Sequence, residues 1–204
     1  MTGRVFSILG LCFAVVFAAG IPVPAQTAPG DFKNEPDKTM AAAHESFMKQ
    51  DVNRAAEQIG KAADYVKQQS GKVAVSAKDG VNQAGEQLAR LGQDVKSGTV
   101  KSGDELKKTY SRVDHALARA WHTTAGEAQK TGKDSTEALK NAGTSLEGAA
   151  RWSGNKMEAG AQASIDAVKK VGTGALKGVK TGSDAVGTWF KGIGQGIEDL
   201  GGKL

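Results

Sequence analysis

The chain has 204 residues, of which 39% are hydrophobic and 24% are charged, and its formal net charge is +5. Charges of both signs are interspersed along it, which is typical of solvated helix faces and argues against a nucleic-acid partner. Cys12 is the only cysteine, so an internal disulfide and a cysteine-based metal site are excluded.

The distribution of proline and glycine predicts the fold class. All four prolines lie at or before Pro36, whereas the 27 glycines continue to the end of the chain. The proline-free remainder can be helical throughout, but glycine weakens each helix that contains it. Leu, Ile, Val and Phe are sparse, and alanine takes many apolar positions, which predicts a thin core. We therefore expect an all-α protein of several long, glycine-rich amphipathic helices, loosely packed or extended, and partly disordered in isolation.

The first 25 residues have the pattern of a signal peptide. Arg4 precedes an apolar run over residues 5–19, and Val23 and Ala25 form the small-residue pair that a signal peptidase recognises. An uncleaved anchor is the alternative, but a spanning helix needs roughly 20 apolar residues. We expect cleavage near Ala25 and an extracytoplasmic chain, periplasmic or secreted, that begins with a flexible leader over residues 26–38.

Residues 39–170 have the pattern of an amphipathic helical repeat region, with breaks near 70–72 and 97–103. Before the first break, apolar residues recur at steps of three and four. Between the two breaks lies a stripe, here called the seam, that has the spacing of a coiled-coil interface but is too short to be a coiled coil. It consists of Ala77, Val81, Ala84, Leu88, Leu91 and Val95. The seam predicts a contact between two helices.

The second break and the stretch after it carry their own signals. Ser102 and Glu105 have the spacing of a capping box, which predicts a helix that starts there. From His122 to Ala138 no large apolar residue occurs, so we expect residues 122–138 to form a polar hinge that is exposed or frayed. The apolar stripe resumes at Leu139.

Residues 171–204 are predicted to form a glycine-rich amphipathic helix. One apolar stripe, here called the anchor residues, contains two adjacent aromatic rings: Val186, Trp189, Phe190, Ile193, Ile197 and Leu200. Trp and Phe beside Lys191 suit the interface of a bilayer. The same stripe would also suit a helix that docks onto the rest of the protein, and the two interpretations have equal weight. Upstream, Gly174, Gly178 and Gly182 would leave one helix face open to close approach.

No constellation of residues points to catalysis. His115 and His122 lie seven apart, a spacing that does not match the i,i+4 pairs of helical metal sites. Acidic residues mostly precede lysines by three or four, as in Glu57 and Lys61, which stabilises helices and needs no other role. We expect no cofactor, no metal and no enzymatic activity.

The Ala/Gly/Lys/Glu/Asp/Thr-rich texture of roughly residues 40–170 includes the segments 61–67 and 159–163 and glycines that recur every 11 residues. It resembles the group 3 late-embryogenesis-abundant proteins and is similar also to exchangeable apolipoproteins. The first resemblance implies stress protection by a chain that folds when water is withdrawn. The second implies reversible lipid binding by amphipathic helices.

These patterns together favour an exported, non-enzymatic helical protein that associates with a membrane or another envelope surface. Its expected partner is a lipid surface or an envelope protein, bound through the anchor residues. Two alternatives remain open at this point. The chain could be a stress-protective or chaperone-like, conditionally disordered protein, or a structural protein that self-associates through the seam.

Overall fold

The computed structural model describes Phe32, residues 34–171 and residues 183–204, and the regular elements within these ranges are all helical. The all-α prediction is therefore confirmed for this part of the chain. The expected signal peptide and the glycines at 174, 178 and 182 lie outside the described residues. The elements are α1 (Asp37–Met48), α2 (Val52–Gln69), the short 3₁₀ helix η1 (Val75–Ala77), α3 (Lys78–Lys96), α4 (Gly103–Lys130), α5 (Thr136–Ser153), α6 (Ala159–Lys170) and α7 (Ser183–Gly201).

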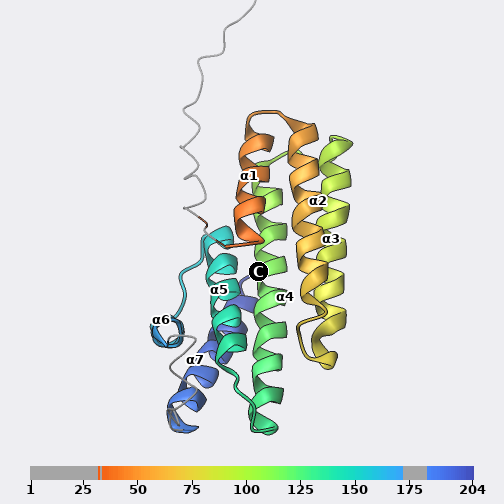
Figure 1. Ribbon diagram of the computed structural model, residues 1–204. Helices are drawn as coiled ribbons and strands as arrows, with labels where there is room; N and C mark the ends of the chain where they lie inside the picture. Colours follow the sequence, from red (N-terminus) through yellow and green to blue (C-terminus); the bar gives the residue numbers. More distant parts are fainter. Residues whose placement is uncertain (1–31, 33, 172–182) are drawn as a thin grey trace, which may run out of the picture.

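The long helix α4 organises the molecule (Figure 1). It has 28 residues, which corresponds to about 42 Å at about 1.5 Å per residue. Helices α1, α2 and α3 lie along one part of it, and α5, α6 and α7 gather on the other side. Two clusters of buried side chains follow from this arrangement, and α4 contributes to both of them.

The first cluster lies between α1, α2, α3 and the N-terminal part of α4. Its largest fully buried side chains are Tyr110, Met40, Ile59, Leu88, Leu106 and Leu117. The seam supplies the α3 side of this cluster: five of its residues are buried there, from Val81 to Val95, and Ala77 packs beside them. The predicted helix–helix contact thus forms within the chain, because the break after α2 folds α3 back onto it.

The second cluster lies between the C-terminal part of α4 and helices α5, α6 and α7. It is centred on Leu139, Leu146, Ile165 and Ile193, all of them fully buried. Alanines such as Ala142 fill the remaining space. A hydrogen bond from Ser111 Oγ to the carbonyl oxygen of Ala149, 2.7 Å long, joins α4 to α5 in the buried region.

The packing is closer than the composition predicted, and glycine is the reason. A side chain at Gly92 would come within 3.4 Å of the carbonyl oxygen of Ala56 in the facing helix α2. At Gly143 it would meet Ile165 Cγ1 at 3.0 Å. Glycines at these crossings let helices approach until the few large apolar side chains fill the space between them. The expectation of loosely packed or extended helices does not describe this arrangement.

The expected polar hinge at 122–138 is helical over most of its length. Helix α4 continues to Lys130, and the chain turns only between Lys130 and Thr136. Ala125 is fully buried, and Thr124 Oγ1 accepts a hydrogen bond of 2.8 Å from the backbone N–H of Ala74. A small apolar side chain and a hydroxyl hold this stretch, although it has no large apolar residue.

The other boundaries lie close to the sequence signals. The two predicted breaks fall between α2 and α3 and between α3 and α4, and Ser102 Oγ accepts a hydrogen bond from the N–H of Glu105 at the start of α4. The leader differs from its prediction, because α1 begins at Asp37 and Phe32 stacks on Trp152 with ring centroids 4.6 Å apart. Among the described helices, none combines the length and apolarity needed to cross a bilayer.

Candidate functional site

The structure divides the anchor residues into two groups. Ile193, Ile197 and Leu200 are buried in the second cluster, where they face α4, α5 and α6. Val186, Trp189 and Phe190, here called the aromatic end of α7, are only half-buried against the same cluster. The sequence left open whether this stripe contacts a bilayer or docks onto the rest of the protein. Its C-terminal part docks onto the second cluster.

Two histidines of α4 hold α7 in register. His122 Nε2 donates to the carbonyl oxygen of Phe190 over 3.0 Å, and His115 Nε2 donates to that of Ile197 over 2.8 Å. The two histidines and the two carbonyls are each seven residues apart, and the later histidine meets the earlier carbonyl. The helices consequently run antiparallel, and the contact repeats after two turns.

Burial lowers the pKa of His122, although its hydrogen bond to Phe190 and the nearby Glu198 carboxylate act in the opposite direction. Its imidazole also stacks on the Phe190 ring with centroids 3.9 Å apart. His122 thus joins α4 to the aromatic end of α7 by a hydrogen bond and by ring contact.

Glycines of α7 make room for these imidazoles. A Cβ at Gly194 would lie 2.9 Å from His122 Nε2, and one at Gly201 would lie 2.8 Å from His115 Nε2. On another face of α7, a Cβ at Gly196 would lie 2.6 Å from the Cβ of Ala161 in α6. Gly194, Gly196 and Gly201 are therefore positions at which α7 contacts α4 and α6 closely. Their effect is not limited to lowering the helix propensity of α7.

A groove of about 510 Å³ runs between α4 and α7 beside these contacts. Its lining combines the two histidines with charges of both signs: His115, Arg119, His122, Thr123, Gly194, Ile197, Glu198 and Gly201. The sequence predicted neither this groove nor the pairing of its histidines with glycines, because the partners lie in different helices.

A second polar site, which sequence reasoning missed, lies where α1, α4 and α5 meet. Asp37 is the first residue of α1 and accepts a hydrogen bond of 2.6 Å from Trp152 Nε1. Asp114 of α4 is fully buried beside it. A signal existed for Asp114, since it stands four residues after Tyr110 on the apolar face of the helix.

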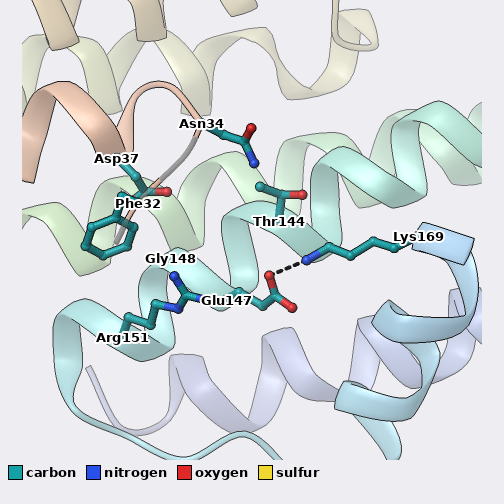
Figure 2. Close-up of a pocket in the computed structure, with 8 residues that line it drawn as sticks. All are labelled: Phe32, Asn34, Asp37, Thr144, Glu147, Gly148, Arg151 and Lys169. Carbon is teal, nitrogen blue, oxygen red and sulfur yellow. Dashed lines mark hydrogen bonds and ion pairs between the residues drawn. The ribbon is translucent and has the colours of Figure 1, made fainter. Parts of the chain in front are cut away.

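A pocket of about 250 Å³ opens beside Asp37 (Figure 2). Asp37, Gly148, Arg151 and Phe32 line one part of it, together with Asn34 and Thr144. At the other part, Lys169 of α6 forms an ion pair with Glu147 of α5.

Burial disfavours the charged forms of both carboxyl groups, and the net effect is larger for Asp114 than for Asp37. Burial raises the pKa of Asp37, whereas the neighbouring Asp114 side chain, the N–H of Trp152 and the charge of Arg151 oppose this rise. Burial also raises the pKa of Asp114, and the neighbouring Asp37 raises it further. Within the described ranges, no group of three or more His, Cys, Asp or Glu side chains is placed to hold a metal ion.

Compared with known protein families, with curated proteins and with solved structures, the chain matches none of them.

Proposed function

We propose that this protein is an exported, non-enzymatic helical protein that associates with an anionic membrane surface through α7. The observation that carries the proposal is the aromatic end of α7: Trp189 and Phe190 lie half-buried beside the exposed Lys191. An amphipathic ring at headgroup depth with a cationic side chain beside it is the arrangement of helices that lie in the membrane interface.

The buried part of the apolar stripe supports the same function, because its contacts with protein can be exchanged for contacts with lipid. Ile193, Ile197 and Leu200 pack on α4–α6 in the docked state. A membrane would bury the same three side chains, so lipid contacts would replace protein contacts when α7 separates from α4, α5 and α6. The net cost of this exchange is smaller than the cost of exposing the stripe to water. Cleavage near Ala25 would remove Arg4 and leave 26 basic against 22 acidic residues, and this formal charge of +4 adds a modest attraction to anionic lipid.

The test is sedimentation of the purified protein with anionic phosphatidylglycerol vesicles and with neutral phosphatidylcholine vesicles. We expect binding to the anionic vesicles and a loss of about tenfold in affinity, or roughly 1.4 kcal/mol, for Trp189→Ala. Val75→Ala is the matched control, because Val75 is 80% exposed and lies in η1, away from α7. Equal affinities of the wild type and Trp189→Ala for the anionic vesicles would show that the aromatic end does not carry the binding.

The same preparation separates the alternatives. Helix gain on drying, without vesicle binding, would favour stress protection by a conditionally disordered chain. Helicity that rises with protein concentration would favour self-association, and an envelope protein remains the partner to seek if vesicles do not bind. Self-association through the seam is the weaker alternative, because Val81, Leu88 and Val95 are already buried within one chain.

A further inference from the structure

Two carboxyl groups from distant parts of the chain meet in the interior. A Cβ placed on Gly148 of α5 would lie 2.5 Å from Asp114 Oδ2 and 2.7 Å from Asp37 Oδ2. The oxygens of both side chains thus reach the same small space, which is open only because residue 148 has no side chain.

Among the described residues, Asp114 has no polar neighbour besides Asp37 that acts on its charge. It is fully buried, and within the described part of the chain no backbone or side-chain N–H or hydroxyl group donates to either of its carboxyl oxygens. A buried carboxylate without a donor or a cation is strongly disfavoured, and a second carboxylate that reaches the same space disfavours it further. One proton on Asp114 removes both problems, because its O–H then donates to the carboxylate of Asp37.

The surroundings of Asp37 indicate which of the two groups keeps the negative charge. Asp37 receives the N–H of Trp152, stands in the first turn of α1, and lies near the Arg151 guanidinium. A helix N-terminus favours a negative side chain, as does a nearby cation. Asp37 is therefore the acceptor and Asp114 the proton donor.

We propose that Asp37 and Asp114 share one proton that fastens α1 to α4 and α5, and that loss of this proton at rising pH loosens this junction. The proton leaves the O–H of Asp114 to solvent through the adjoining pocket, and two negative charges then remain in one buried space. Phe32 would lose its position at the same time, because it stacks on Trp152, the residue that donates to Asp37.

The other charged groups around the two carboxyl groups influence how stability changes with pH and over which pH range. Arg151 faces Asp37 from α5 and favours its charged form, while Glu35, just before α1, opposes it. On Asp114 the only charged neighbour that acts in the described part of the chain is Asp37. Because the pKa of each carboxyl group is raised on folding, their contribution to stability is complete below the usual aspartate value and is lost as the pH rises through the folded value.

Histidine acts with the opposite sign and must be separated from this effect. Burial lowers the pKa of His44 on α1, and the charge of Lys107 lowers it further. His44 therefore reduces stability as the pH falls below the ordinary histidine value of 6.5. A variant that changes only the carboxyl pair distinguishes the two contributions.

The test compares the wild type with Asp114→Asn, whose amide can donate to Asp37 but cannot lose a proton. Urea unfolding would be measured from about pH 4 to about pH 9. Between the unfolded and folded pKa values of Asp114, unfolding of the wild type releases one proton. The folding equilibrium constant should therefore fall by up to about tenfold per pH unit in this range. We expect this component to be absent from Asp114→Asn and retained in Asp94→Asn, a control at an exposed position of α3.

Two further measurements on the intact wild-type protein do not depend on the stability of a variant. The infrared spectrum at neutral pH should contain the band of a protonated carboxylic acid. Hydrogen-exchange protection of α1 should fall relative to that of α2 and α3 as the pH rises. Absence of the infrared band, or an Asp114→Asn profile with the pH dependence of the wild type, would overturn the proposal. A rise in the melting temperature of the wild type with Ca²⁺, absent in Asp114→Asn, would also overturn it and assign the pair to a cation.

Discussion

Single glycines decide where side chains can meet in this molecule. Gly148 leaves the space in which the Asp37 and Asp114 carboxyl groups come together, and Gly194 leaves the space for the His122 imidazole. Other glycines have open surroundings, since a Cβ at Gly187 or Gly160 would meet no atom of the described residues within 4 Å apart from its own stretch of backbone. The sequence does not distinguish glycines at close contacts from glycines with open surroundings. From composition alone, each glycine was therefore expected only to weaken its helix.

Gly148 and Gly160 should respond in opposite ways to replacement by alanine. Gly148→Ala should lower the free energy of unfolding by roughly 1–3 kcal/mol, because a methyl group overpacks the carboxyl pair. Gly160→Ala should raise it by up to about 1 kcal/mol, because alanine has the higher helix propensity and the space is free. Urea unfolding at neutral pH measures both. A stabilised Gly148→Ala would contradict the described position of the two carboxyl groups.

At the scale of the element, the sequence predicted which faces are apolar but not what covers them. The seam and the anchor residues have the periodicity of buried stripes, and the structure buries the seam against α2 and α4 within one chain. Periodicity records only the direction in which a helix faces, so a bilayer, a second copy and a neighbouring helix produce the same pattern. Asp114 and Trp152 were missed for a related reason, since their partner Asp37 belongs to a helix far away in the sequence.

The docking of α7 can be weakened without changing its apolar stripe. Gly194→Ala should displace the His122 imidazole and break its hydrogen bond to Phe190, which loosens α7 from α4. If docking and membrane binding compete for the same stripe, this variant should bind anionic vesicles more tightly, by about threefold to tenfold. Gly187→Ala is the matched control, because it has the same chemical change in the same helix and open surroundings.

Hydrogen exchange in α7 provides the second measurement for this pair. Protection should fall in Gly194→Ala and stay at or above the wild-type level in Gly187→Ala. Unchanged exchange and unchanged vesicle affinity in Gly194→Ala would mean that the imidazole contact does not control the helix.

At the scale of the whole molecule, α4 joins two clusters of buried side chains into one body. Leu106 and Leu117 belong to the first cluster, and Ala118 and Ala125 to the second, all of them on this helix. Composition underestimated this packing because the contribution of alanine and glycine at close helix crossings depends on tertiary geometry, which local patterns do not contain.

This arrangement predicts cooperative unfolding. Leu88→Ala in the first cluster and Leu146→Ala in the second should each cost about 2–5 kcal/mol, because both side chains are fully buried. Each variant should lower the midpoint of one shared transition, measured by urea unfolding with helix content as the probe. Two separate transitions, each affected by only one of the variants, would show that α4 does not couple the clusters.

The contact of Phe32 and Asp37 with Trp152 bears on the order in which the chain can acquire its structure. The ribosome completes α1 long before α5 exists. During synthesis the earliest helix therefore lacks its partner on this side, and Phe32 and Asp37 cannot form these contacts until Trp152 has been made.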